Sequence, residues 1–141
     1  MTPSTKLTIA PLAKRHDRAG FSCGVEALDT YLRTRAGQDQ RRRVARVFVC
    51  CGEDSEAVFG YYTLSSLAIE LRDLPVDKAL RLPRHPVPAA LIGRLAVSSD
   101  LQGQGIGRLL LADAVKRALA VSEEVAIYAL VVDAKDERAS G

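Results

Sequence analysis

The sequence predicts an α/β (α+β) domain in which a mixed central sheet is flanked by helices. Three observations support this fold class: short β-rich or apolar runs recur along the chain, a stretch with helical spacing follows a glycine-rich turn, and a second helical stretch lies near the N-terminus. The 141 residues, 48% hydrophobic and 26% charged, suffice for one core. We therefore expect a single domain over residues 1–141.

The N-terminal half is expected to contain a strand, a helix and a β-hairpin. Leu7–Leu12 has the composition of a short strand, and a basic, polar segment follows it. Residues 25–40 are expected to be helical, because Val25, Leu28 and Leu32 fall on one face. Two β-rich runs then flank a polar turn and predict a hairpin: Arg46–Cys51 and Val58–Leu64.

The C-terminal half is expected to place a central strand beside a long helix. Leu67–Leu71 either extends the preceding strand or forms its own. Prolines from Pro83 onward predict a rigid extended loop that lasts until the central strand, Leu91–Val97. The helix is expected over Gly105–Ala120, with an apolar stripe of Ile106, Leu109, Leu110, Ala114 and Leu119. Val125–Val132 is continuously apolar, which predicts a buried strand beside the central one.

Cysteine usage and hydropathy favour a cytoplasmic protein. Cys23, Cys50 and Cys51 show neither a disulfide framework nor metal-ligand spacing, so we expect reduced, packed thiols, with a reactive cysteine as the alternative. No apolar run approaches the roughly 20 residues of a membrane span. The N-terminus also lacks the apolar core of a signal peptide.

Basic charge is concentrated in the first 50 residues, although the formal net charge of the chain is only +3. Six arginines lie within residues 33–46: Arg33, Arg35, Arg41, Arg42, Arg43 and Arg46. Arginine pairs bidentately with phosphate, so this block is consistent with contact to a nucleic-acid backbone. A solvated helix end is the alternative, and charge alone favours neither.

The stretch Gln102–Arg108 predicts a binding site for a phosphorylated cofactor. An apolar strand precedes it, a helix follows it, and Gly103, Gly105 and Gly107 stand on alternate positions. Glycines let the backbone approach a phosphate, and the N–H groups of a helix's first turn point at it. The spacing is neither that of a P-loop nor G-x-G-x-x-G. A flexible glycine hinge is the alternative.

The run Gln102-Gly103-Gln104-Gly105-Ile106-Gly107 resembles the Q/R-x-x-G-x-G/A pattern of the GCN5-related N-acetyltransferases (GNAT). The resemblance implies that this loop and the following helix, with Arg108, hold the pyrophosphate of acetyl-CoA. It also implies that the backbone of Leu95, Ala96 and Val97 pairs with pantetheine like an added strand. In the same picture a backbone N–H near Val97 stabilises the oxyanion. We thus expect the GNAT fold and an acetyl-CoA-dependent acetyltransferase.

Further short motifs resemble the acetyltransferase toxins of type II toxin–antitoxin modules. In chain order they are Phe21-Ser22-Cys23-Gly24, Leu28-Asp29-x-Tyr31-Leu32, Gly60-Tyr61-Tyr62-x-Leu64, Pro86-Val87-Pro88, Gly93-Arg94-Leu95-Ala96-Val97 and Val132-Asp133-Ala134. The resemblance implies that the α-amine of aminoacyl-tRNA is acetylated, which blocks translation. It also implies a ribbon-helix-helix antitoxin as partner, and a homodimer.

The same resemblance bears on substrate binding and on the catalytic acid. Arginines expected to line the tRNA backbone are Arg35, Arg41, Arg42, Arg43, Arg84 and Arg94. Family members continue past the last strand with a helix carrying a Phe-Tyr pair and with further strands, and that tyrosine is the expected general acid. The sequence ends at Gly141 before such a pair, so we expect a C-terminally incomplete domain with no certain catalytic residue. Tyr61, Tyr62 and Tyr128 are expected to be packed aromatics.

Two other functions remain open from the sequence. One is acetylation of a small amine or a protein N-terminus, which predicts an acidic acceptor pocket and no dependence on the basic block. The other is a truncated, non-catalytic module that binds acetyl-CoA or the antitoxin. The candidates for a general base are His85 and Glu70.

Overall fold

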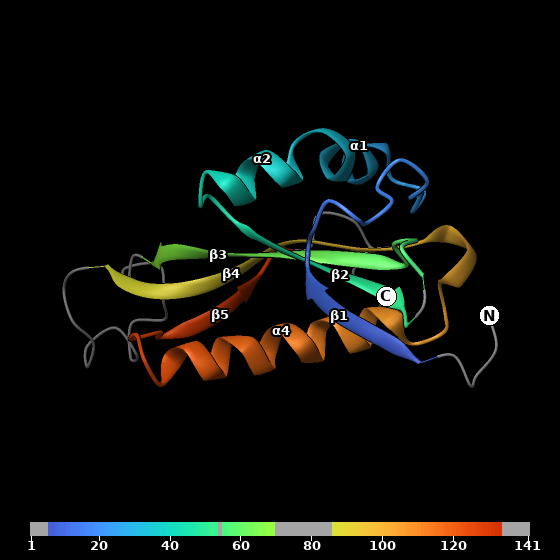
Figure 1. The fold of residues 1–141 in the computed structure, drawn as a ribbon. Coiled ribbons are helices and arrows are strands. Elements are labelled where there is room, and N and C mark those ends of the chain that lie inside the picture. Colours follow the sequence, from blue (N-terminus) through green and yellow to red (C-terminus); the bar gives the residue numbers. More distant parts are fainter. Residues whose placement is uncertain (1–5, 54, 70–85, 134–141) are drawn as a thin grey trace.

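The computed structural model describes residues 6–53, 55–69 and 86–133, and its centre is a five-stranded sheet (Figure 1). The order of the strands in the sheet is the same as their order along the chain: β1 (Leu7–Pro11), β2 (Arg46–Gly52), β3 (Gly60–Ile69), β4 (Val87–Val97) and β5 (Ala129–Val132). Strands β1 to β4 pair antiparallel, whereas β5 pairs parallel with β4. The mixed sheet expected from the sequence is therefore confirmed.

Helices cover both faces of this sheet (Figure 1). Helices α1 (Glu26–Thr34) and α2 (Ala36–Arg41) lie over one face, and α4 (Ile106–Ser122) lies over the other. A short 3-10 helix, η2 (Ser99–Leu101), leads from β4 to the turn before α4. Among the helices of the described residues, none is both long and apolar enough to cross a membrane.

Alternation along β2 and β3 supplies a hydrophobic core on each face of the sheet. On β2, Val47 and Val49 belong to the core under α1 and α2, whereas Phe48 belongs to the core under α4. On β3, the neighbours Tyr61 and Tyr62 are divided between the two cores in the same way. Each helical layer is therefore held by its own set of apolar contacts.

The three cysteines are free thiols buried in these cores. Desolvation raises the pKa of Cys23 to about 11 and that of Cys50 to about 12. Thiols with such pKa values stay protonated at neutral pH, whereas the nucleophilic form is the thiolate. The expectation of packed thiols is confirmed, which argues against a reactive cysteine.

The single helix expected over residues 25–40 is wrong, because two helices meet at Arg35. No glycine or proline stands at this position. The end of α2 is fixed by Gln40, whose Nε2 donates to the Leu12 carbonyl (2.9 Å) and whose Oε1 accepts from the Val47 amide (3.1 Å). Hydrophobic periodicity along the helix does not record these contacts with other elements.

Strand β4 begins at Val87 and not at Leu91, so the extended loop expected from Pro83 onward ends earlier. Strand β3 is correspondingly long and reaches Ile69, which pairs with Val87. The alternative in which the second hairpin strand is extended is thus confirmed. The carbonyl of Pro88 accepts from the Tyr128 amide (2.8 Å), so the nitrogen of Pro88, which carries no hydrogen, also faces the β5 side. Pro88 is tolerated within β4 because it removes no hydrogen bond between β3 and β4.

Two expectations about burial are also wrong. Leu109 and Leu119 of α4 are 40% and 64% exposed, and Ala118 is buried instead. Of the apolar run before Asp133, only Ala129–Val132 forms a strand, and its side chains are half-buried or exposed. The reason is positional: β5 lies at the end of the described sheet and has a neighbour on one side.

Candidate functional site

The turn between η2 and α4 is shaped by two glycines in the left-handed region. Gly103 has a φ of 83°, and Gly105, the N-cap of α4, has a φ of 87°. A Cβ at either position would meet no heavy atom within 4 Å. These glycines therefore provide a backbone conformation and free space above the turn, not packing. Gly107 differs, because it lies inside the first turn of α4.

The first turn of α4 presents backbone donors to this free space. No side-chain hydrogen bond caps the helix within the described chain, and its ladder begins with the Leu109 amide donating to the Gly105 carbonyl (3.1 Å). The N–H groups of residues 106–108 precede that ladder, and the positive end of the helix dipole lies beside them. Backbone donors arranged in this way at a helix N-terminus can bind an anion.

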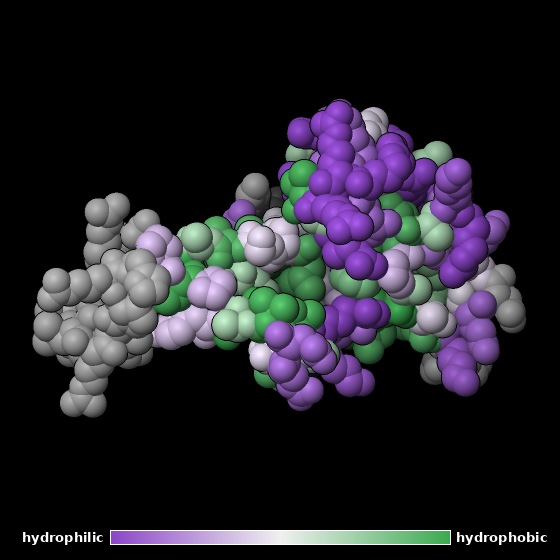
Figure 2. Space-filling view, turned by 60° about the vertical axis from the view of Figure 1, so that its left-hand side comes forward, coloured by the Kyte–Doolittle hydropathy of each residue, from purple (hydrophilic) through white to green (hydrophobic). Residues whose placement is uncertain are grey.

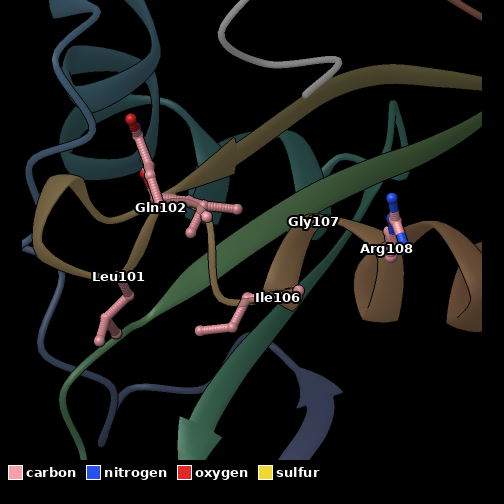
Figure 3. A pocket seen from close by; sticks show the side chains of 8 residues that line it. Leu101, Gln102, Ile106, Gly107 and Arg108 are labelled. Carbon is pink, nitrogen blue, oxygen red and sulfur yellow. Dashed lines mark hydrogen bonds between the residues drawn. The ribbon is translucent and has the colours of Figure 1, made fainter.

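A pocket of about 500 Å³ lies over this turn (Figure 3). The side chains of Leu101 and Ile106 point to one side, where both are buried, and those of Gln102 and Arg108 point away from them (Figure 3). Arg108 is exposed, so its charge is available to an anion on the turn. The lining consists of Val97, Leu101, Gln102, Gly103, Gly105, Ile106, Gly107 and Arg108.

The Gln102 side chain fastens the turn to two other segments. Its Nε2 donates to the carbonyl of Val97 (3.1 Å) and to the carbonyl of Cys23 (2.9 Å). A third bond runs in parallel, from the Ser99 amide to the Ser22 carbonyl (2.8 Å). The turn is therefore tied both to the end of β4 and to the loop before α1. The sequence motif named Gln102 but gave no indication of these contacts, whereas Gln104 is exposed on the turn.

At the end of β4, beside the turn, some backbone N–H and C=O groups face away from β3. The Ser98 amide donates to the Phe59 carbonyl (2.8 Å), so Ser98 faces β3. Because peptide groups alternate along a strand, the N–H and C=O of Leu95 and Val97 face the opposite side. A ligand with amide groups can add to such a strand edge.

Strand β5 does not cover that side of β4. Its pairing is limited to Ala89–Ile92, and Gly93 is the extra residue of a bulge at this point. Within the described ranges, no strand pairs with this side of β4 after the bulge. The side chain of Gln102 occupies only the Val97 carbonyl at the end of the strand. The expected cofactor-binding residues Leu95–Val97 and Gln102–Arg108 therefore come together at one place.

The expected tRNA-binding arginines fall into two groups. Arg35, Arg41, Arg42 and Arg43 are exposed on the α1–α2 layer, where hydrophilic side chains gather at the top of Figure 2. Arg43 has a φ of 61° and helps line a depression of about 630 Å³ that Arg46, Ser65 and Ser66 also line. Arg94 is apart from this block and half-buried on β4. Arg84 lies outside the described residues, as do His85 and Glu70.

The tyrosines of β3 are packed, as expected. Tyr61 Oη donates to the Leu28 carbonyl (2.7 Å), and Tyr62 Oη donates to Asp113 Oδ2 (2.6 Å). Burial raises the pKa of both phenols well above the ordinary value, so neither is suited to give up a proton at neutral pH. Tyr128 departs from the expectation, because it is 49% exposed.

Known proteins are similar to this chain in sequence and in fold. The acetyltransferase (GNAT) family model matches residues 18–140. The chain is 36% identical over 123 residues to the tRNA-acetylating toxin of Mycobacterium tuberculosis, covering 87% of this chain and 72% of that protein. It is also similar to the structure of AtaT complexed with acetyl-methionyl-tRNAfMet, with a TM-score of 0.86 and 36% identity over 95% of this chain and 81% of that chain.

A further similar structure contains both a cofactor and a partner. It is an AtaT variant bound to the C-terminus of the antitoxin AtaR and acetyl-CoA, with a TM-score of 0.78 and 33% identity over 95% of this chain and 78% of that chain. The glycine turn at the start of α4 and the β4 edge beside it thus occur in a chain whose relatives are acetyltransferases. The chain belongs to the acetyltransferase (GNAT) family.

Proposed function

We propose that this chain transfers the acetyl group of acetyl-CoA to the α-amine of aminoacyl-tRNA, as the toxin of a type II toxin–antitoxin pair. The observation that carries the proposal is the donor-rich start of α4 beside an edge of β4 that no strand of the described residues covers, in a chain 36% identical to a tRNA-acetylating toxin. Residues 1–141 would act as one acetyltransferase domain.

The proposed cofactor contacts follow from the geometry of the turn. The N–H groups around Gly103–Gly107 and the guanidinium of Arg108 would hold the pyrophosphate. The backbone of Leu95 and Val97 would pair with the amides of the pantetheine arm. The residues present fit this group, because a Cβ at Gly103 or Gly105 would project into free space. Acetyl-CoA supplies the thioester when bound.

Few catalytic side chains are needed for this acceptor. An α-amine has a pKa of about 7.7–8.0, against about 10.4 for lysine, and esterification of the neighbouring carboxyl lowers it further. Such an amine is largely neutral at cytoplasmic pH, so holding it at the β4 edge supplies much of the catalysis. The Val97 N–H faces that edge and would stabilise the oxyanion. We assign no general acid among the described residues.

The proposed partners are an aminoacyl-tRNA, a ribbon-helix-helix antitoxin and a second copy of the chain, in the cytoplasm where charged tRNA is found. The antitoxin is supported by the AtaT variant that was solved with the C-terminus of AtaR. The tRNA is supported by the exposed arginines of the α1–α2 layer. An acidic acceptor pocket, which a small-amine enzyme would need, is not formed by the residues that line the pocket over the turn.

The proposal is tested by calorimetry and by a transfer assay. Calorimetry with acetyl-CoA and with CoA is expected to detect binding of both. The chain is then incubated with labelled acetyl-CoA and charged tRNA, a small primary amine, or a peptide with a free N-terminus. We expect label on the aminoacyl-tRNA alone. Label on the amine or the peptide would show that the substrate is a small amine or a protein N-terminus. Binding of acetyl-CoA without transfer to any acceptor would support the non-catalytic alternative.

Replacing Arg41, Arg42 and Arg43 together by alanine is expected to weaken tRNA binding whatever amino acid it carries. These exposed side chains would contact phosphates, so the slope of log K against log salt should become shallower by up to about 3. Fluorescence anisotropy at several salt concentrations measures both quantities. Lys116→Ala, an exposed site on α4, serves as the control. An unchanged salt slope in the triple variant would reject the assignment.

A further inference from the structure

Arg94 is held differently from the other arginines of the expected tRNA surface. It is half-buried on β4, and its Cζ lies 3.8 Å from the centroid of the Tyr31 ring. Tyr31 is itself fixed: it is 4% exposed, stacks on Tyr61 at 6.4 Å and 14°, and donates from Oη to Asp39 Oδ2 (2.8 Å). The flat face of the guanidinium thus rests on a rigid aromatic platform.

The described residues do not use the N–H edges of this guanidinium. Within residues 6–53, 55–69 and 86–133, the aromatic ring under it is that of Tyr31, and no hydrogen bond or ion pair of the Arg94 side chain is found. Keeping a charged group half-buried without acceptors is unfavourable unless a ligand or water supplies them. A guanidinium presents its donors in a fork that matches phosphate bidentately.

A second cation acts on the same place. Desolvation and the bond to Asp39 raise the pKa of Tyr31 to about 12, while the charges of Arg94 and Arg35 act in the opposite direction. Both guanidinium groups therefore lie within electrostatic range of the Tyr31 hydroxyl. Arg35 is exposed at the junction of α1 and α2, so it is free to approach a ligand that Arg94 holds.

The position of Arg94 on β4 shows how far Arg94 lies from the proposed acetyl-transfer site. Arg94 pairs with Thr63, which pairs with Val47, so its side chain shares the α1–α2 face of the sheet with Val47. Val97 is three residues further along, about 10 Å at about 3.3 Å per residue. In an RNA that is esterified at its 3′ end, the last phosphodiester is one ribose away from the aminoacyl group.

We propose that Arg94, flat on Tyr31 and assisted by Arg35, binds a backbone phosphate at the single-stranded 3′ end of the acceptor RNA. This inference rests on the proposed function and goes beyond it. The exposed block of Arg41–Arg43 contacts the body of the tRNA, and Arg94 selects an acceptor whose amine is linked to a phosphodiester. Free amines and protein N-termini lack that group and would be poor substrates for this reason.

The test compares two small acceptors that differ by one phosphate. One is the aminoacyl ester of adenosine, and the other is the aminoacyl ester of the dinucleotide cytidylyl-adenosine. Arg94→Met keeps the aliphatic stem on Tyr31 and removes the charge. It is expected to lower kcat/KM for the dinucleotide ester by about 10- to 100-fold and that for the adenosine ester by no more than about two-fold. Arg94→Lys, which keeps the charge but not the fork, should recover part of the loss.

Three readouts separate phosphate binding from support of the fold. The affinity for acetyl-CoA and the melting temperature should be those of the unchanged chain, and Lys116→Met, which removes an exposed charge from α4 on the other face of the sheet, should leave both acceptors unaffected. Calorimetry with uncharged cytidylyl-adenosine and with adenosine measures the phosphate contact without turnover. Arg94→Met should weaken only the dinucleotide.

An equal loss with both esters, or a weaker affinity for acetyl-CoA, would overturn the inference and make Arg94 a structural residue. An unchanged preference for the dinucleotide in Arg94→Met would also overturn it. Failure of the proposed function has a different signature, because the unchanged chain would then acetylate neither ester. The calorimetric comparison of dinucleotide and adenosine still decides the role of Arg94 in that case.

Discussion

Replacing Gly105 by valine is expected to weaken acetyl-CoA binding by at least about 100-fold while leaving the chain folded. Gly105 has a φ of 87° as the N-cap of α4, a conformation that costs a side-chain-bearing residue roughly 1–2 kcal/mol and a β-branched one more. The added side chain would also project into the free space over the turn. It would hold the pyrophosphate away from the N–H groups, and each such charge-assisted hydrogen bond is worth about 1.5–3 kcal/mol.

Calorimetry with acetyl-CoA measures this loss, and thermal unfolding measures the accompanying change in stability. The melting temperature should fall by only several degrees, because the Cβ meets no neighbour. Gln104→Ala is the matched control, since Gln104 lies on the same turn and is exposed. Retention of full acetyl-CoA affinity by Gly105→Val would contradict the placement of the cofactor at this turn.

Replacing Gly60 by valine is expected to lower the free energy of unfolding by about 3 kcal/mol or more. A Cβ on Gly60 would lie 2.9 Å from the Ala96 carbonyl oxygen and 3.0 Å from Leu110 Cδ1. The first of these atoms belongs to the backbone of β4, so β3 and β4 must separate for the side chain to fit. Overpacking of a core costs typically about 1–3 kcal/mol, and a clash with backbone adds to it.

Urea unfolding followed by circular dichroism measures the effect. Gly93→Ala is the control: its Cβ would approach only the Thr63 hydroxyl, at 3.3 Å, and a side chain can rotate away. The smaller substitution should therefore cost clearly less. Gly60→Val should also weaken acetyl-CoA binding, because the same Cβ would press on Ile106 at the start of α4. Stability equal to that of the unchanged chain would show that β3 and α4 are packed less closely than the structure has them.

The glycine turn was largely predictable because its chemistry is local. Gly103 and Gly105 adopt positive φ, as a turn that opens a helix requires, and α4 begins one residue after the expected start. The hairpin of β2 and β3 and the central strand were also predicted, since β-rich runs separated by turn residues carry their signal in sequence. The cofactor roles of these residues remain predictions.

Other features depended on contacts between distant residues. The link from Gln102 to Cys23 spans 79 positions, and the bond from Tyr62 to Asp113 spans 51. Arg117 joins the second of these, with Nε 2.7 Å from Asp113 Oδ2 and Cζ 4.1 Å from the Phe48 ring. The i, i+4 spacing of Asp113 and Arg117 predicts their ion pair, but nothing in the sequence predicts the tyrosine and the aromatic ring around it.

The arginines show the same division. Composition identified a basic N-terminal half, and the exposed positions of Arg41–Arg43 agree with an open surface. Composition could not distinguish Arg94 from Arg41–Arg43, because only the register of β4 with β3 places the Arg94 side chain over Tyr31. Arg84 belongs to the residues that the structure does not describe.

By itself the sequence determined the α/β class, the order of the strands along the chain and the glycine turn at the start of α4, because these follow from local propensity, apolar periodicity and glycine spacing. Only the tertiary structure decided where β4 begins, which face of α4 is buried, where the first helix breaks and which arginine is fixed on a tyrosine. The bulge at Gly93 illustrates the physical reason. One extra residue shifts the register of a strand, and register is set by pairing with neighbours that lie far away in the sequence.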